Sequence, residues 1–398
     1  MAITSTRRTE VSQAVEPALA LAVADVNWYT TENLFREVQR PGVSTLLLRC
    51  FDYYNAWMRG IPPWAWGRAL SQCGPRLWQR ELVLPSGWMK SFPALGMRPI
   101  GRSIRSWWRE HAPAGRLALV MTYPHYLYLR DIVKPDYQIY FNIDDYTQYW
   151  PRWAQRVSVL EQQAVREADV TVCVSRLRAE ELRAAVPAAA ERIRHLPHGS
   201  PTNMLSEHPW DHPATPPADL AAMPRPLLGY VGNLEDRVDW RLLDRLSAAF
   251  PHGSVVVVGK ALPKQRGAWY ADCERFLARP NVHALGWRPQ DVIHEYNRSF
   301  DVCLIPYRTD HPFNRACSPT KIMDYMSTGR PIVSTALPEC RLYDQLFHVA
   351  ADEAEFIDAV REILALGSDD GRAPQRFDWA SSNTCQRVAE RLLDWLPV

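Results

Sequence analysis

A strand, a helix and a second strand in close succession constrain the fold more than any other part of the sequence. Residues 301–306 and 331–334 are apolar and have the length of buried strands. Between them, Ser318 can cap a helix, Pro319 suits its first position, and Gly329 can end it in the left-handed conformation. This order predicts a parallel α/β sheet. The helix would begin at the carboxyl edge of that sheet, where such folds bind ligands.

The predicted helix carries residue types that suit a nucleotide. Lys321 and Asp324 are three residues apart, so they share one face near the helix start. A lysine beside Ser318, Pro319 and Thr320, at the positive end of the helix, suits a diphosphate. A carboxylate one turn further can accept both hydrogen bonds from a ribose diol. The alternative is an exposed ion pair between the two side chains, which would contribute only about 0.2–0.5 kcal/mol.

This region resembles the donor-nucleotide motif of GT-B-fold bacterial glycosyltransferases, the retaining enzymes of the family 4 and family 1 type that build surface polysaccharides. The resemblance is carried by the runs D-V-C-L-I-P-Y-R and S-P-T-K-I-M-D-Y-M-S-T-G-R-P-I-V-S-T. It implies an α/β fold of two facing doubly wound, Rossmann-like domains with a central cleft. Asp324 stands where the family usually has glutamate. Ala316 replaces a second acid that many relatives carry near the donor sugar, so we transfer no such role.

The chain is long enough for two domains of this kind. It has 398 residues, of which 47% are apolar and 23% charged, and its formal charge of +2 argues against a general nucleic-acid binder. With the resemblance, we expect these parts: 1–15 a loose tail, 16–200 the acceptor-binding domain, 201–226 a proline-rich linker, 227–375 the nucleotide-sugar domain, and 376–398 a helix crossing back to the first domain.

Other features bear on the compartment and on metals. The eight cysteines are scattered, without a C-x-x-C pair, and several lie in apolar runs, so we expect buried thiols in a reducing compartment. No apolar run reaches the roughly 18–20 residues of a membrane span. Acids soon after Arg7 and Arg8 argue against a secretory signal, so we expect a cytoplasmic protein. The donor half has no Asp-x-Asp arrangement, and we expect no metal or other cofactor.

Residues 57–109 combine tryptophan with cationic side chains. Seven tryptophans are interleaved with eight arginines and one lysine, and Glu81 is the single acid. Such a mixture suits a surface that meets anionic lipid at the inner face of the membrane, or a cleft for a lipid-pyrophosphate acceptor. Two alternatives stay open. In the first, the tryptophans form the core of a small domain under solvated arginines. In the second, the stretch binds nucleic acid.

The strand predicted at residues 137–146 ends on Asp144 and Asp145. The segment resembles a family signature of the form Tyr-Asp-x-x-Asp-Asp/Glu-Tyr, with Phe141 and Asn142 in place of its opening pair. Both acids are candidate catalytic residues, and Asp144 is the one expected to take the proton of the acceptor hydroxyl. Alternatively, Asp145 caps the following helix. His198 lies in a turn where the family usually has asparagine, and it is either a cleft residue or a structural one.

Five residues of the second half complete the predicted donor site. Gly232 follows a strand, and Arg237 matches the family's arginine on the donor pyrophosphate, although it could instead pair with a neighbouring acid on the surface. Lys260 is a further phosphate candidate. By the resemblance, Gly286 and the next residue, Trp287, belong to the pocket of the nucleotide base.

Taken together, these features predict a glycosyltransferase. It would move a hexose-type sugar from a nucleotide-diphosphate sugar to a saccharide or a polyprenyl-diphosphate-linked acceptor, while Arg237 and Lys321 neutralise the leaving diphosphate. The resemblance implies retention of the anomeric configuration. Alternatives are a nucleotide-sugar epimerase or pyruvyl transferase of the same fold, and a non-catalytic carbohydrate-binding protein.

Overall fold

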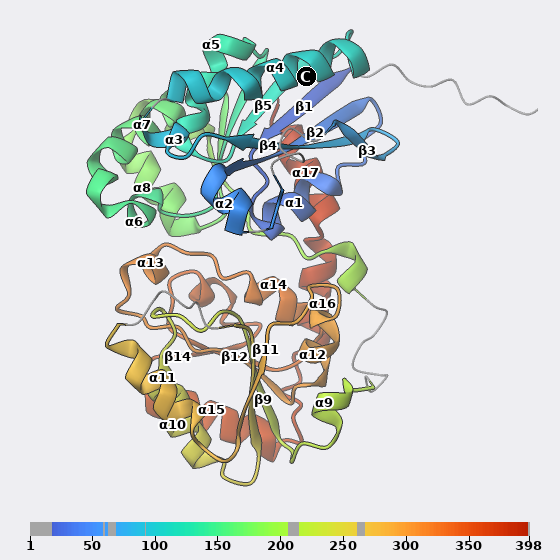
Figure 1. Ribbon diagram of the computed structural model, residues 1–398. Helices are drawn as coiled ribbons and strands as arrows, with labels where there is room; N and C mark the ends of the chain where they lie inside the picture. The colour runs from blue at the N-terminus through green and yellow to red at the C-terminus, as the bar shows by residue number, and fades with distance from the viewer. Residues whose placement is uncertain are drawn as a thin grey trace, which may run out of the picture.

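The chain folds into two α/β units that are stacked with a cleft between them (Figure 1). This computed structural model describes residues 18–58, 60–62, 69–91, 93–205, 215–260 and 267–396. The predicted tail, residues 1–15, lies outside the described part. Among the described residues, no helix combines the length and the apolar character that crossing a membrane requires.

The N-terminal unit is built on an eight-stranded sheet with the order β3-β4-β2-β1-β5-β6-β7-β8. The strands are β1 Leu19–Ala24, β2 Val43–Asp52, β3 Ser71–Gly74, β4 Leu77–Leu84, β5 Arg116–Met121, β6 Tyr137–Asn142, β7 Val170–Cys173 and β8 Ile193–His195. All neighbours are parallel except β3 and β4. The central strand β1 is buried along its whole length, as its unbroken apolar run requires when helices cover both faces.

Helices of the N-terminal unit connect these strands. They are α1 Tyr29–Arg36, α2 Tyr53–Met58, α3 Trp88–Ser91, α4 Pro93–His111, η2 Pro124–Tyr128, α5 Leu129–Val133, α6 Tyr146–Tyr149, η3 Pro151–Trp153, α7 Ala154–Glu167, α8 Arg176–Ala185 and η4 Pro187–Arg192. The carboxyl ends of the parallel strands share one edge of the sheet. That edge faces the cleft, because residues that directly follow β1 and β6 line the cavity there.

The C-terminal unit has a six-stranded parallel sheet with the order β11-β10-β9-β12-β13-β14. Its strands are β9 Leu227–Val231, β10 Ser254–Val258, β11 Val282–Gly286, β12 Val302–Ile305, β13 Ile332–Thr335 and β14 His348–Ala350. Its helices include α10 Trp240–Ala249, α11 Trp269–Leu277, α12 Ile293–Ser299, α13 Pro312–Arg315, α14 Lys321–Met326, η6 Cys340–Tyr343, α15 Glu353–Ala365 and α16 Ala373–Ser382. In Figure 1, α10, α11 and α15 lie on one side of this sheet and α12 and α16 on the other. The predicted fold class, two doubly wound units, is confirmed.

Two segments connect the units and are hydrogen-bonded to each other. The Ser200 N–H donates to the Asn383 carbonyl oxygen (2.9 Å), and the Cys385 N–H donates to the Ser200 carbonyl oxygen (2.9 Å). The linker predicted at 201–226 contains two short helical pieces, η5 Thr202–Met204 and α9 Ala218–Ala221, and its residues 206–214 lie outside the described part.

The last predicted helix is interrupted by the same crossing. Helix α16 ends at Ser382, and Thr384 caps the separate helix α17 Cys385–Asp394 by accepting a hydrogen bond from the Arg387 N–H. Side chains of α17, such as Leu392 and Leu393, join the core of the N-terminal unit. Helix α17 therefore packs on the unit that contains β1.

The Trp- and Arg-rich stretch divides between core and surface. Trp78, Trp88 and Trp107 are buried in the N-terminal core, which supports the core alternative for these three. Trp64 and Trp66 lie outside the described residues. Exposed arginines of the stretch lie on α4, at positions 98, 102 and 109.

The burial predicted for the cysteines is confirmed at seven positions. All eight thiols are free, and each is buried except that of Cys73, which lies on β3 at the edge of the sheet. A thiol is small and weakly polar, so it packs like an apolar side chain at the buried positions.

Arg376 on α16 anchors the end of α14, which carries two predicted site residues. Its guanidinium is fully buried and donates to the carbonyl oxygens of Gly329 (2.8 and 3.2 Å) and Leu346 (3.0 Å). Both oxygens of the buried Asp370 carboxylate accept from the same group at 2.7 Å. Gly329 has a φ of 69°, as predicted for a glycine that ends a helix.

Replacing this arginine should destabilise the C-terminal unit. Arg376→Ala leaves Asp370 buried without its cation, so we expect the free energy of unfolding to fall by about 3–5 kcal/mol in urea denaturation. Arg361→Ala is the control, because Arg361 pairs with Asp358 on the surface, where an ion pair contributes less than about 1 kcal/mol. Equal losses in the two variants would contradict this account of Arg376.

Candidate functional site

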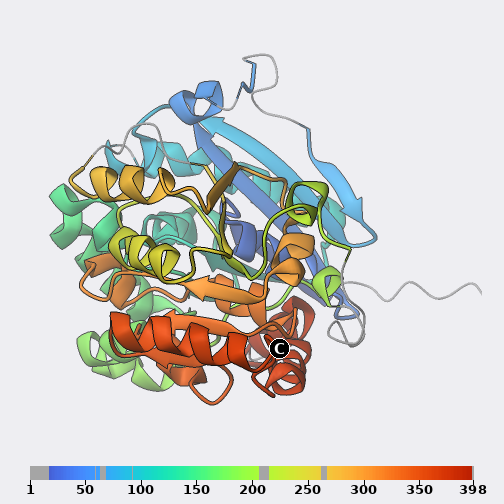
Figure 2. The ribbon, with the colours of Figure 1, turned by 90° about the horizontal axis from the view of Figure 1, so that it is seen from below.

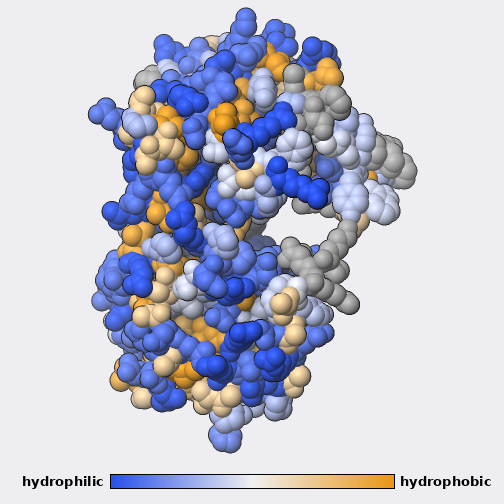
Figure 3. Space-filling view, turned by 90° about the vertical axis from the view of Figure 1, so that its left-hand side faces the viewer, coloured by the Kyte–Doolittle hydropathy of each residue, from blue (hydrophilic) through white to orange (hydrophobic). Residues whose placement is uncertain are grey.

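A cavity of about 900 Å³ lies between the units and is lined by both. Figure 3 shows the surface hollowed between them. Ten of the predicted site residues line this cavity: Asp144, His198, Gly232, Arg237, Trp287, Ser318, Pro319, Thr320, Lys321 and Asp324. Asp145, Lys260 and Gly286 are not among its lining residues.

Lys321 holds a buried charge on the C-terminal wall. The side chain is 8% exposed, and its Nζ donates to the hydroxyl oxygen of Tyr307 (2.6 Å). Nζ also lies over the rings of Tyr230 (5.1 Å) and Tyr307 (4.9 Å). Within the described part of the chain, no carboxylate comes within ion-pair distance of this ammonium group. The predicted alternative, a surface pair with Asp324, therefore does not occur.

Arg237 and Lys321 both donate hydrogen bonds to the Tyr307 hydroxyl. One guanidinium nitrogen donates to the Tyr307 hydroxyl (3.3 Å), and Nε donates to Glu235 (2.6 Å). The guanidinium also lies over the rings of Tyr307 (4.8 Å) and Phe313 (5.1 Å). The pair with Glu235 was the surface alternative, but here both partners line the cavity. Tyr307, which sequence reasoning did not single out, is thus the group that brings two cations together.

Glycines at two strand ends keep this wall open. A Cβ at Gly232 would lie 2.7 Å from the Lys321 ammonium nitrogen, and one at Gly259 would lie 1.9 Å from the Gly232 carbonyl oxygen. Any larger residue at either position would displace the lysine or the neighbouring turn. The small residue predicted at 232 is therefore required first of all by Lys321.

The start of α14 differs from the prediction. The helix begins at Lys321 and has six residues, and Thr320 occupies the cap position without a side-chain hydrogen bond. Ser318 is therefore not the N-cap. The Ile322 N–H donates to the Pro319 carbonyl oxygen (3.1 Å), which makes the first turn tight. Because so short a helix has a weak dipole, the two cations are the main source of positive potential here.

Asp324 provides a carboxylate deeper in the same wall. No donor among the described residues bonds its side chain. Burial raises the pKa of Asp324 to about 6, although the nearby Lys321 charge lowers it. A partly buried carboxylate of this kind can accept hydrogen bonds from a bound ligand.

Asp144 faces this wall from the N-terminal unit. Its Oδ2 accepts a hydrogen bond from the Tyr149 hydroxyl (2.7 Å). Burial raises the pKa of Asp144 to about 6, while that hydrogen bond and the charge of Arg237 lower it. The turn that carries Asp144 is fixed by Asn142, whose Nδ2 donates to the Asp144 carbonyl oxygen (3.0 Å) and to Glu161 (2.8 Å).

The neighbouring acid has a structural role. Asp145 caps α6: it accepts from the Thr147 N–H (3.1 Å) and hydroxyl (2.6 Å). It also lies 3.9 Å from Arg178, which forms an ion pair with the buried Glu161. This is the capping alternative, and Asp145 is not among the residues that line the cavity. Sequence reasoning missed Glu161 and Arg178, because neither lies in a recognisable motif.

The remaining predicted residues differ in position. His198 is buried beside the cavity, and burial lowers its pKa to about 4, so the ring is neutral near pH 7. Lys260 is exposed just after β10. Gly286 ends β11 with a φ of 71°, and its carbonyl oxygen accepts from the Gly259 N–H (3.0 Å). Trp287 lines the cavity although 61% of it is exposed.

Comparison with known proteins shows a family match for part of the chain and a shared fold for most of it. Residues 225–366 match the family described as glycosyl transferases group 1. A protein of Bacillus subtilis (strain 168), assigned to teichuronic acid biosynthesis as a glycosyltransferase, is 22% identical over 214 residues, which are 53% of this chain and 52% of that protein. The match thus spans about half of that relative's length.

Solved structures with low sequence identity share the arrangement of both units. Sucrose-phosphate synthase of Thermosynechococcus elongatus has a TM-score of 0.69 at 13% identity, covering 94% of this chain and 97% of its own. HepE of Anabaena, in complex with UDP and glucose, has a TM-score of 0.65 at 14% identity, covering 94% and 98%. A UDP-forming α,α-trehalose-phosphate synthase of Burkholderia vietnamiensis has 0.69 at 12% identity, covering 96% and 100%.

The raised pKa of Asp324 predicts a pH-dependent stability. The folded state keeps the proton up to about pH 6, whereas the unfolded chain releases it near 3.8. The contribution of Asp324 to the free energy of unfolding is therefore most favourable below about pH 4, and it is lost as the pH rises through 6. Asp324→Asn removes this loss, so the melting temperature of the wild type should fall relative to the variant between pH 4 and 7. Thermal scans should show no such divergence for the exposed control Asp358→Asn.

Proposed function

We propose that this GT-B-fold chain, whose residues 225–366 form a glycosyl transferases group 1 domain, is a glycosyltransferase of surface polysaccharide biosynthesis. It would move a hexose-type sugar from a nucleotide-diphosphate sugar to a saccharide or lipid-linked saccharide. The observation that carries the proposal is the pair of cations on Tyr307, Lys321 and Arg237, which lies across the cavity from Asp144.

The cations would bind the donor diphosphate and stabilise its departure. Lys321 has no carboxylate partner within the described part of the chain, so a phosphate oxygen can take the position of its counterion. As the bond from the anomeric carbon to the diphosphate breaks, negative charge grows on the leaving oxygen, and fixed cations stabilise that charge most. Because Tyr307 holds both side chains in place, little reorganisation is needed.

The nucleoside would lie further along the same wall. We propose that Asp324 accepts hydrogen bonds from the ribose diol and that the Trp287 ring contacts the base. Solved structures of HepE contain UDP and UDP-glucose, so uridine nucleotides are the first donors to test.

Asp144 would act on the acceptor. The acceptor hydroxyl oxygen forms the new bond to the anomeric carbon, and its proton passes to the Asp144 carboxylate. Tyr149 keeps that carboxylate oriented by its hydrogen bond. Retention of the anomeric configuration is part of the proposal through the family resemblance, and it requires the acceptor hydroxyl to attack from the same face on which the diphosphate leaves.

Two further expectations belong to this proposal. Since Lys321 and Arg237 supply fixed positive charge, we propose that transfer needs no divalent metal; among the described residues, no group of three or more acidic, histidine or cysteine side chains could hold one. Turnover in EDTA tests this. We also propose a cytoplasmic protein that meets anionic lipid through the arginine-bearing part of the stretch 57–109, where the exposed arginines 98, 102 and 109 lie on α4.

Removing the buried ammonium tests the role of the cations. Lys321→Ala should lower kcat/KM by about 100-fold or more, because one stabilising charge at the leaving group is lost. The assay incubates the protein with a panel of nucleotide sugars and measures released nucleotide diphosphate. Arg308→Ala, which removes a cation paired with Asp310 outside the cavity, is the control. Unchanged turnover in Lys321→Ala would refute the proposal. Labelled sugar that never reaches an acceptor would favour an epimerase or a binding protein.

The pH profile tests Asp144. The carboxylate must be ionised to accept a proton, and its pKa is about 6, so kcat/KM should rise with pH through 6 and then level. Asp144→Asn should lose this rise together with about 100-fold or more of the rate. The exposed Asp131→Asn should keep the wild-type profile. A wild-type rate that is constant from pH 5 to 8 would exclude Asp144 as the base.

A further inference from the structure

Aromatic residues collect at the cleft-facing edge of the N-terminal sheet. They follow the carboxyl ends of three parallel strands: Trp28 and Tyr29 after β1; Tyr53, Tyr54 and Trp57 after β2; Tyr149, Trp150 and Trp153 after β6. Because these strands are parallel, their ends share one edge, and so do the segments that follow them. The edge that carries Asp144 is therefore also rich in aromatic side chains.

Part of this set lines the cavity. Trp28 packs edge-on against Tyr149 (5.9 Å between ring centres), and Tyr149 meets Phe313 of the opposite unit (5.6 Å). Trp28 is held by a hydrogen bond from its Nε1 to the Tyr123 hydroxyl (2.8 Å). These rings are fixed by neighbours on two sides. They form the inner end of the aromatic edge, beside Asp144.

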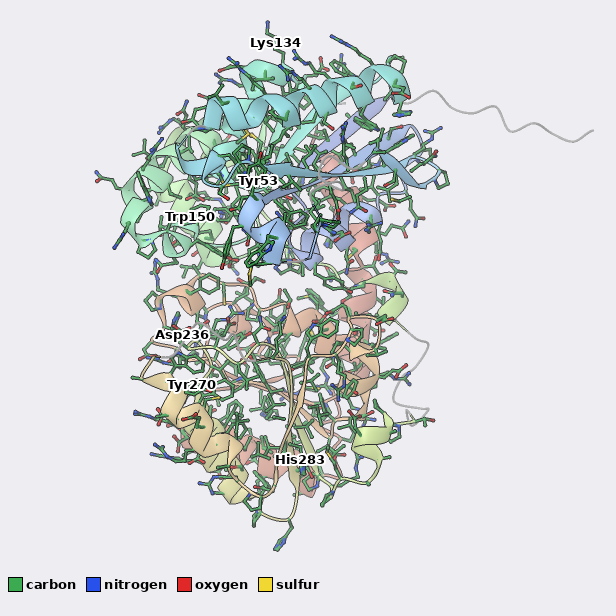
Figure 4. The ribbon with its side chains drawn as sticks, in the orientation of Figure 1. Tyr53, Lys134, Trp150, Asp236, Tyr270 and His283 are labelled. Atoms are coloured by element: carbon green, nitrogen blue, oxygen red, sulfur yellow. The ribbon has the colours of Figure 1, made fainter. Side chains whose placement is uncertain are left out.

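The remaining rings are not among the lining residues of the cavity, and we call them the aromatic rim: Tyr53, Tyr54, Trp57, Trp150 and Trp153. Trp150 contacts Tyr149 (6.2 Å), which links the rim to the cavity. Trp153 is 45% exposed, and the Arg156 guanidinium lies over its ring. In Figure 4, Tyr53 and Trp150 both lie on the part of the N-terminal unit that faces the other unit.

Helix α2 presents its part of the rim to solvent. Asp52 fixes the helix start by accepting from the Asn55 N–H (2.7 Å), and the buried Ala56 packs against the unit. Tyr54 and Trp57 are consequently 47% and 70% exposed, with ring centres 6.4 Å apart. Seen from below, the C-terminal unit leaves α2 uncovered (Figure 2). Large exposed rings grouped in this way mark an interaction surface.

The charges around α2 indicate the kind of ligand. Helix α2, Y-Y-N-A-W-M, has no charged residue, and the exposed arginines at 98, 102 and 109 lie on α4. The cations of the rim, Arg152 and Arg156, lie at its other end, beside Trp153. At α2, where Tyr54 and Trp57 are exposed, anionic lipid would require cations among the rings. A neutral saccharide does not: the C–H face of a pyranose is apolar and packs on an aromatic face, and its hydroxyl groups bond tyrosine and amide side chains.

We infer that the aromatic rim binds the saccharide chain of the acceptor, at sugars beyond the one that receives the new residue. This inference rests on the proposed function, since the reacting end of the same chain would lie at Asp144. The acceptor would then be an oligosaccharide or polysaccharide, and its affinity would increase with the number of sugars until the rim is covered.

Trp57→Ala tests the inference, because this side chain is the most exposed ring and supports little of the core. The probes are bacterial polysaccharide fragments of two to eight sugars, with phosphatidylglycerol vesicles as a separate arm. We expect the wild type to bind longer fragments more tightly, and Trp57→Ala to bind them about fivefold or more weakly. Leu366→Ala, an equally exposed apolar residue of the other unit, should bind as the wild type does.

Three outcomes would overturn the inference. In the first, fragment affinity does not depend on fragment length. In the second, fragments bind Trp57→Ala as tightly as they bind the wild type. In the third, Trp57→Ala loses only its binding to vesicles, which would make the rim a lipid surface. Calorimetry with UDP separates these results from failure of the proposed function. Trp57→Ala should bind UDP like the wild type, whereas a wild type that binds no nucleotide would refute the transferase itself.

Discussion

The C-terminal wall of the cavity is organised around one buried cation, the ammonium group of Lys321. Removing such a group from water costs several kcal/mol, whereas contacts with aromatic faces return only about 2 kcal/mol. Among the described residues its partners are the Tyr307 hydroxyl and the rings of Tyr230 and Tyr307. An anion that entered the cavity would therefore gain more here than at the surface. The fold maintains this imbalance, because Arg376 anchors the end of the helix that carries the lysine.

The geometry of the cavity follows from the way the two sheets meet. The N-terminal sheet turns its carboxyl edge to the cleft and presents Asp144, while Arg237 follows β9 of the other sheet, so a carboxylate and a guanidinium face one space. Two connections joined at Ser200 keep the units in this relation, and α17 returns to the first core. A donor on one wall and an acceptor on the other can thus meet without either wall changing its own hydrogen bonds.

Much of the fold and of the site was predictable from the sequence. The strands and contacts that were not predictable escaped for physical reasons. Unbroken apolar runs such as β1 and β12 are unambiguous, whereas β4 alternates with polar residues and β8 has three residues, so neither was recognised. The helix pattern led to Lys321, and the family resemblance led to Arg237 and Asp144. Neither could reveal Tyr307 as the common partner of Lys321 and Arg237, or Glu161 behind Asp144, because these contacts join residues distant in sequence. The Ser318 cap was wrong because the turn tightens on Pro319.

The most direct test of the central claim is a crystal structure of the protein with UDP. The account predicts that diphosphate oxygens lie about 2.7–3.2 Å from both the Lys321 ammonium and the Arg237 guanidinium. The ribose diol should then lie on Asp324. A nucleotide bound outside the cavity would contradict this claim. So would a nucleotide inside the cavity whose phosphates contact neither Lys321 nor Arg237.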